Sequence, residues 1–234
     1  MQTVGLIKDL ITGILFKLVI LSGLAMSHDI YADALKQNER LMLSILNTSN
    51  FESDAWEEIR FNGLTNYQIQ GSDQHNFLKA ESKNSASGLV FKKEIDLSKT
   101  PYLNWSWRLE QALPELPETT KSGDDYAARI YLIHSSGWFF WQTKALNYVW
   151  SSRDSKHTSW ANAYAPDNAL MFAIRDKSDS KSVWFAEKRQ VQADFKAWLG
   201  KEINQIEGVA IMTDTDDSKG HALVYYGDIY FSAD

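Results

Sequence analysis

Short apolar runs bounded by polar turns dominate the pattern of hydrophobic and polar positions along this chain. The alternation is cleanest over residues 102–110, where every second residue is apolar: Leu103, Trp105, Trp107 and Leu109. Such alternation is typical of a strand with one buried face and one polar face. We predict strands over residues 86–95, 102–110, 126–134, 170–175, 182–188, 209–213 and 221–231, and weaker strands over residues 57–64, 67–70, 76–81 and 145–150.

Helical periodicity is confined to two stretches. Residues 191–199 gather Val191, Phe195 and Trp198 on one face, and Gly200 is a suitable C-terminal stop. Residues 33–46 show a less regular amphipathic pattern. A parallel sheet would need a helix between successive strands, and those helices are missing. We therefore predict an all-β fold, an antiparallel β-sandwich of jelly-roll type with one or two short helices.

The chain after residue 32 fits a single β-sandwich domain, residues 33–234. No Pro/Gly/Ser-rich linker, charge run or internal repeat divides it. With four prolines, twelve glycines and 44% hydrophobic residues, the composition is that of a globular domain with a sizeable core.

The N-terminal segment has the features of a secretory signal peptide, residues 1–32. Lys8 and Lys17 precede an apolar run over residues 18–26, and Ala32 offers a small residue at the cleavage position. A retained anchor is the alternative, but Lys17 divides the apolar stretch, and a bilayer span needs roughly 20 continuous apolar residues. We predict cleavage before Asp33, a periplasmic or secreted location, and no stable membrane anchor after cleavage.

The net charge limits the classes of binding partner, and the cysteine content limits the sources of stability. The formal net charge is −6, and the two lysines and two aspartates of residues 1–32 cancel, so the mature chain keeps this charge. An acidic protein is a poor partner for nucleic acid or an anionic membrane. The chain has no cysteine, so stability outside the cytoplasm must come from the core rather than from disulfides.

Four motifs occur in order along the chain. Residues 123–132 read Gly-Asp-Asp-Tyr-Ala-Ala-Arg-Ile-Tyr-Leu, residues 146–150 read Leu-Asn-Tyr-Val-Trp, an apolar run over residues 208–212 leads into Asp-Thr-Asp-Asp at 214–217, and residues 226–231 read Tyr-Gly-Asp-Ile-Tyr-Phe. In these motifs the chain resembles the DUF3047 family of exported bacterial proteins of unknown function. The resemblance implies an architecture and a location but no reaction. Residues 86–97 and 101–109 also resemble the opening half of jelly-roll carbohydrate-binding modules, a likeness of fold that does not fix function.

Aromatic residues make up 13% of the chain, and four of them lie within residues 138–141. A strand that buries alternate residues cannot hide all four in one core, so some must face a second surface. One interpretation is a sugar-stacking platform, because a flat ring offers apolar area to the C–H side of a pyranose. The other is ordinary core filling, which we favour for Trp105, Trp107 and Trp184. Both stay open for Trp160 and for the ligand-binding candidates Trp138, Trp141, Tyr148 and Trp150.

Arg129 and Tyr131 are two residues apart on a predicted strand and share its polar face. Arg129 could pair with Asp124 or Asp125, or with a carboxylate from elsewhere such as Glu187, as a purely structural ion pair. It could instead anchor an acidic group of a ligand. Both interpretations stay open, and Asp124, Asp125, Arg129 and Tyr131 are therefore ligand-binding candidates.

The acidic turn at residues 214–220 suggests a cation site. Asp214, Asp216 and Asp217 offer carboxylates at a spacing that partly matches a calcium loop, but the distant glutamate of that motif is absent. Turns between strands are rich in Asp, Ser and Gly for backbone reasons alone. We expect no cofactor, and a structural calcium ion at these residues is the alternative. The five histidines show no ligand-type pairing, which argues against a transition metal.

Two classes of function remain. The sequence has no Gly-x-Ser-x-Gly elbow, no cysteine nucleophile and no phosphate loop. We therefore favour a non-catalytic exported protein that binds a glycan or another cell-envelope ligand on an aromatic and acidic surface. The alternative is a polysaccharide-active enzyme on the same scaffold. It would be a hydrolase that uses two carboxylates, or a lyase that uses Tyr131, His134 and Arg129. A closed cleft with perturbed carboxylates would favour the enzyme, and an open strip of rings would favour binding.

Overall fold

The computed structural model describes residues 42–49, 55–72, 75–135 and 143–234. The predicted signal peptide, most of the predicted helix at 33–46, and both Trp138 and Trp141 lie outside these residues. The single-domain prediction for residues 33–234 also reaches beyond them and stays a prediction. In the described part of the chain, no helix has the length and apolar character needed to cross a membrane.

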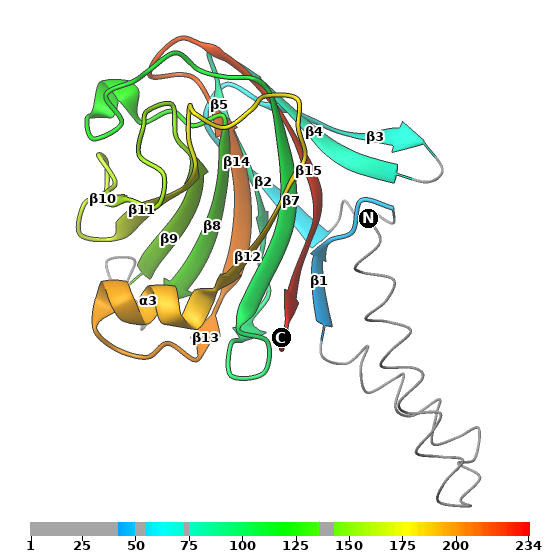
Figure 1. Ribbon diagram of the computed structural model, residues 1–234, viewed down its shortest axis with the longest axis vertical. Helices are drawn as coiled ribbons and strands as arrows, with labels where there is room; N and C mark the ends of the chain where they lie inside the picture. Colours follow the sequence, from blue (N-terminus) through cyan, green and yellow to red (C-terminus); the bar gives the residue numbers. More distant parts are fainter. Residues whose placement is uncertain (1–41, 50–54, 73–74, 136–142) are drawn as a thin grey trace, which may run out of the picture. The chain divides into compact units, whose positions relative to one another are not determined.

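Two sheets form the architecture (Figure 1). The six-stranded sheet has the order β12 (Phe185–Gln190), β7 (Tyr102–Gln111), β15 (His221–Ser232), β4 (His75–Lys83), β3 (Asn66–Ser72), and β1 (Met42–Leu46) also pairs with β15. The seven-stranded sheet has the order β10 (Ser159–Ala161), β11 (Ala169–Arg175), β9 (Thr143–Trp150), β8 (Ala128–Ser135), β14 (Gly208–Asp214), β5 (Ala86–Phe91), β2 (Trp56–Asn62). A short pair, β6 (Ile95–Asp96) with β13 (Gln205–Ile206), lies outside both. The described strands pair antiparallel except for β9 with β11.

The hydrophobic core lies between the two sheets, where side chains of β7 meet those of β9. Trp105 stacks on Tyr148 with ring centroids 5.4 Å apart, and Trp107 lies 5.8 Å from Trp150. Tyr226 of β15 crosses the core and donates its hydroxyl to the carbonyl of Met212 in β14, at 3.0 Å. Alternation along β7 therefore works as predicted, because its apolar residues are buried and its polar residues are only partly so.

The prediction of an antiparallel β-sandwich of jelly-roll type is confirmed. Helix α3 (Val191–Leu199) has the predicted bounds and ends at Gly200, whose φ of 68° is left-handed. The predicted helix was wrong over residues 42–46, which form β1. There Ile45 and Leu46 are buried against the core, because pairing with β15 outweighs a weak helical pattern. Strands β10 and β13 were not predicted, since two or three residues are too few to show a period.

Trp105 and Trp107 are core residues as predicted, but Trp184 is not. Its side chain is 40% exposed, because β12 begins only at Phe185 and Trp184 lies in the loop before it.

Candidate functional site

A pocket of about 520 Å³ opens on the face of the seven-stranded sheet that points away from the core. We call it the acidic pocket. Along β8 the core receives Ala128, Ile130 and Leu132, so the alternate residues Arg129 and Tyr131 face outward. The rest of the lining comes from neighbouring strands and loops and includes Phe61, Asp124, Asn147, Asn162, Tyr164, Asn168, Met212, Asp214, Asp216 and Asp217.

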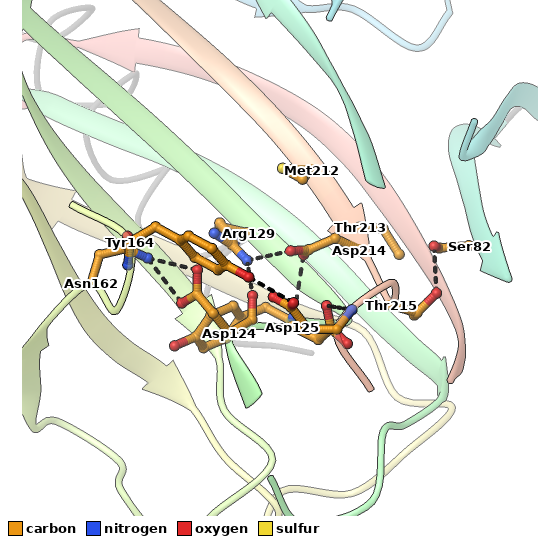
Figure 2. Close-up of polar contacts among 12 residues, drawn as sticks. Ser82, Asp124, Asp125, Arg129, Asn162, Tyr164, Met212, Thr213, Asp214 and Thr215 are labelled. Carbon is orange, nitrogen blue, oxygen red and sulfur yellow. Dashed lines mark hydrogen bonds and ion pairs between the residues drawn. The ribbon is translucent and has the colours of Figure 1, made fainter. Parts of the chain in front are cut away.

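Arg129 is the centre of this pocket, with only 3% of its surface exposed. Its Nη2 donates to Oδ2 of Asp214 at 2.5 Å and to the backbone carbonyl of Asp124 at 3.0 Å, and its Nη1 donates to the Tyr131 hydroxyl at 2.7 Å. The guanidinium carbon lies 4.4 Å from the centroid of the Tyr126 ring. Figure 2 shows the guanidinium directed at Asp214. The arginine is therefore held on several sides before any ligand binds.

Asp124 joins a neighbouring turn to the site. Both of its carboxylate oxygens accept a hydrogen bond from Nδ2 of Asn162, each at 2.9 Å (Figure 2). Oδ1 of Asn162 in turn accepts hydrogen bonds from the backbone N–H groups of Tyr164, at 3.0 Å, and Ala165, at 2.9 Å. The Tyr164 ring is 54% exposed, and its hydroxyl donates to Asp217 at 2.7 Å. This chain of contacts fixes an exposed ring at the rim of the pocket.

Asp125 has a different role from Asp124. It is fully buried, and its two carboxylate oxygens accept the backbone N–H groups of Asp217 at 3.2 Å and Ser218 at 2.6 Å. These bonds tie the turn after β14 to the start of β8. Asp125 therefore shapes the acidic pocket without lining it.

Burial raises the pKa of several carboxyl groups here. Burial raises the pKa of Asp214 to about 8, and the nearby Asp125 and Asp124 add to the rise while Arg129 opposes it. The pKa of Asp124 is also raised, mainly by burial. For Arg129, burial alone would lower the pKa, but Asp214, Tyr131, Asp124 and Tyr126 together outweigh this, and the pKa lies above its ordinary value. The guanidinium stays charged and faces more acidic groups than it can neutralise.

A calcium ion fits these residues only in part. Asp125, Asp214 and Asp216 each offer one oxygen, and these oxygens lie within 4.8 Å of one another. Calcium takes 6–8 oxygen ligands, and here Arg129 already supplies positive charge to Asp214. Of the predicted ligands, Asp217 is directed instead to the Tyr164 hydroxyl. The calcium site stays a prediction, with Asp125 now grouped beside Asp214 and Asp216.

The structure brings Asp124, Arg129 and Tyr131 together but leaves Tyr148 and Trp150 elsewhere. Both rings are buried in the core between the sheets, on the opposite face of β9 from the acidic pocket. The Tyr148 hydroxyl donates to Asp194 at 2.6 Å, and Trp150 Nε1 donates to the carbonyl of Asp176 at 3.0 Å. Strict alternation explains this, because their neighbour Asn147 takes the outward position.

The lining residues missed from the sequence include Phe61, Asn147, Asn162 and Tyr164. Asn147 carried a usable signal, since it interrupts the apolar run at residues 146–150. Asn162 and Tyr164 lie in a loop whose position is set by contacts distant in sequence.

Glu187 and His134, which the sequence suggested could act together with Arg129, have other partners in the structure. Glu187 pairs with Arg175 at 2.6 Å, and His134 Nδ1 lies 3.0 Å from the carbonyl of Gln205.

The model of a family described as "Protein of unknown function (DUF3047)" matches residues 54–230. The chain belongs to the DUF3047 family. The match covers the strands from β2 almost to the end of β15, and thus every described residue named in the acidic pocket. A comparison of this DUF3047 chain with curated proteins finds no match.

Solved structures with a distant likeness include a thermostable cellulase derived from the Cel12A cellulase of Rhodothermus marinus. It has 8% identity and a TM-score of 0.46, over 80% of this chain and 97% of that one. The family 11 carbohydrate-binding module of a Clostridium thermocellum cellulase has 10% identity and a TM-score of 0.42, over 82% and 94%. The glycoside hydrolase domain of Endo-D from Streptococcus pneumoniae R6 has 10% identity and a TM-score of 0.40, and the match covers 76% of this chain but 22% of that one. A likeness at this level carries no inference about the function of the DUF3047 chain.

Proposed function

We propose that this protein binds a glycan, such as one of the cell envelope, in the acidic pocket and does so without catalysis. The observation that carries this proposal is the pairing of two exposed rings with carboxylates in one pocket. Phe61 is 69% exposed and Tyr164 is 54% exposed, and both line the pocket together with Asp216 and Asp217. A ring offers apolar area to the C–H face of a sugar, while a carboxylate accepts hydrogen bonds from its hydroxyl groups.

The charge of the acidic pocket limits the classes of glycan that can bind there. Among the described lining residues, four acidic side chains surround the single guanidinium of Arg129: Asp124, Asp214, Asp216 and Asp217. The pKa values of Asp124, Asp214 and Asp217 are raised, mainly by burial and in part by neighbouring acids. A uronate or a phosphate would bring a further negative charge into a site where ionisation is already unfavourable. The pocket therefore suits a neutral sugar or an amino sugar.

A polysaccharide hydrolase is the second candidate, and the raised pKa of Asp214 and Asp124 is the observation that favours it. A carboxyl group that keeps its proton near neutral pH can act as a general acid. Against this, protein groups already bond the oxygens of both residues. Asn162 donates to both oxygens of Asp124, and Asp214 accepts hydrogen bonds from the Arg129 guanidinium and from the backbone N–H of Tyr126. A binding role needs no freed carboxylate and is the simpler account.

Isothermal titration of the mature protein with soluble oligosaccharides tests the binding role. Phe61→Ala or Tyr164→Ala should weaken binding by at least about tenfold, or about 1.4 kcal/mol, while the melting temperature changes little because both rings are exposed. Met42→Ala is the matched control, since Met42 is 54% exposed and is not among the lining residues. If the two ring variants bind as well as the wild type does, the acidic pocket is not the glycan site.

A product assay separates the two candidates. The wild type is incubated with the same oligosaccharides, and new reducing ends are measured. Release of product that Asp214→Asn and Asp124→Asn abolish would replace the binding proposal with the hydrolase. The proposed binding needs no cofactor. A rise in melting temperature on adding calcium, lost in Asp216→Asn, would support a structural ion at Asp125, Asp214 and Asp216.

We also propose that the protein acts outside the cytoplasm, in the periplasm or as a secreted protein. The support is the basic start, the apolar run at residues 18–26 and the small residue Ala32. N-terminal sequencing of the protein from its native host tests this, with Asp33 as the expected first residue. Recovery of the uncleaved chain from the cytosol would contradict it.

A further inference from the structure

A second pocket, of about 670 Å³, lies on the opposite side of the sandwich, on the outer face of the six-stranded sheet. We call it the tryptophan pocket. Outward-facing residues of three adjacent strands line it: Asn104 and Ser106 of β7, Lys188 of β12, and Asp228 and Tyr230 of β15. Phe77 and Trp184 complete its apolar side.

A β-bulge shapes this pocket. Trp107 pairs with Tyr226 and Trp105 pairs with Ile229, so two steps along β7 face three steps along β15. Gly227 occupies the bulge, and a Cβ atom there would lie 2.2 Å from Oγ of Ser106 and 3.6 Å from the Trp184 ring. Only glycine leaves this space open.

Trp105 is among the lining residues, but its ring is 2% exposed and stacks on Tyr148 in the core, so only its position on β7, beside the bulge, borders the pocket. The side chains of β7 that face the pocket are those of Asn104 and Ser106.

The exposed Trp184 ring is held in position by its neighbours. It lies 6.0 Å from the Phe77 ring, and the guanidinium of Arg108 lies 5.4 Å from the Trp184 ring and 4.6 Å from the Tyr225 ring. Cation–π contact with two rings fixes the arginine between them. The indole is therefore an exposed but ordered surface, which lowers the entropic cost of stacking a ligand on it.

The charges in the tryptophan pocket are balanced, in contrast to the acidic pocket. Lys188 and Asp228 have opposite signs, and Glu187 is already paired with Arg175. Asp228 also accepts the backbone N–H and the hydroxyl of Thr48, both at 2.8 Å. A ligand with no net charge, an apolar face and oxygen acceptors matches this lining.

We propose that the tryptophan pocket is a second, independent binding site that takes a neutral sugar residue. The sugar stacks on Trp184, while Ser106 and Asn104 contact its hydroxyl groups. The two pockets open on opposite sheets, so one protein molecule can hold two glycan strands at once.

The test is the stoichiometry of binding, measured by isothermal titration of the mature wild type with two neutral probes, cellohexaose and the hexamer of N-acetylglucosamine. Trp184→Ala should remove one of the sites or weaken it by at least about tenfold, because a stacking ring carries that much of a recognition surface. Gly227→Ala should have the same effect by filling the pocket. Val183→Ala is the control, since Val183 is 45% exposed next to Trp184 but is not a lining residue.

A second measurement guards against a variant that merely misfolds. The indole N–H resonance of Trp184, assigned with Trp184→Phe, should shift when the wild type is titrated with the probe that binds. The same shift should persist in Phe61→Ala, which alters only the acidic pocket. The proposal is overturned if neither probe binds, if Trp184→Ala binds both probes like the wild type, or if the Trp184 resonance does not respond. In the last two cases binding lost in Phe61→Ala would still support the acidic pocket.

Discussion

Arg129 is a buried cation whose counter-charge comes from Asp214, with side-chain exposures of 4% and 5%. Asp214 supplies this counter-charge once it ionises, above its pKa of about 8. Removing Arg129 above that pH leaves a buried carboxylate uncompensated, so Arg129→Ala should cost about 3–5 kcal/mol of unfolding free energy at about pH 9. Arg60→Ala is the control, because Arg60 pairs with Glu58 at 65% exposure and should cost at most about 1 kcal/mol. Chemical denaturation measures both. A loss under about 1 kcal/mol for Arg129→Ala would mean that the arginine is not a structural element of the fold.

The raised carboxyl pKa values predict an unusual dependence of stability on pH. The pKa of Asp214 rises from 3.8 to about 8, so between these values the folded state holds a proton that the unfolded state has lost. Stability should therefore fall as pH rises from about 4 to about 8, by up to about 1.4 kcal/mol per pH unit for each such proton. Asp176 and Asp179, whose pKa values are lowered, act in the opposite sense but only below about pH 4.

Urea denaturation at several pH values between about 5 and 8 measures this slope. Asp214→Asn should flatten it, because the amide cannot titrate. Glu94→Gln, a substitution at an exposed carboxylate outside the cluster, is the control and should keep it. Stability that increases with pH over this range in the wild type would contradict the prediction.

At the scale of elements, strands with clean alternation and the helix α3 could be predicted from sequence, whereas the partners of side chains could not. Alternation placed Arg129 and Tyr131 on one face of β8 correctly. The sequence suggested Asp124, Asp125 or a distant carboxylate such as Glu187 as the partner of Arg129, and the partner is a distant carboxylate that the sequence did not single out for this role, Asp214. Strand β14 pairs with β8 and sets Met212 opposite Arg129, so Asp214 lies two residues further on. Pairing between strands more than eighty residues apart leaves no local trace in the sequence.

The turn that delivers Asp124 and Asp125 depends on Gly123 at the end of the short 3-10 helix η2 (Lys121–Gly123). A Cβ atom at Gly123 would lie 2.7 Å from the backbone of Pro117, so Gly123→Ala should force the turn to move. We expect a loss of about 1–3 kcal/mol and weaker glycan binding, because Asp124 moves with the turn.

Gly200→Ala is the matched control for this turn. Its φ of 68° disfavours alanine by about 1–2 kcal/mol, but a Cβ atom there meets nothing within 4 Å, and the end of α3 is not part of the acidic pocket. The control should therefore lose stability and keep its affinity. Unchanged affinity in Gly123→Ala, measured by the same titration, would separate the turn from the site.

At the scale of the whole molecule, β15 is central to the six-stranded sheet because it pairs with three other strands. It pairs with β7 and β4 along its length and with β1 near its end, where Ile229 and Phe231 are fully buried in the core. Removing residues 228–234 would delete both side chains and unpair β1. Each large apolar side chain lost from a core costs about 2–5 kcal/mol, and a domain is stable by only about 5–15 kcal/mol in total.

We therefore expect the chain truncated after Gly227 to lose its folded state entirely, rather than to lose one edge of a sheet. Loss of the cooperative thermal transition, followed by far-UV circular dichroism, is the measurement. Deletion of Ala233 and Asp234 alone is the control. These residues follow the strand and are partly or fully exposed, so the transition should shift by a few degrees at most. A cooperative transition in the longer truncation, within a few degrees of the wild type, would show that the sandwich is stable without the end of β15 and that β1 is not needed to complete the six-stranded sheet.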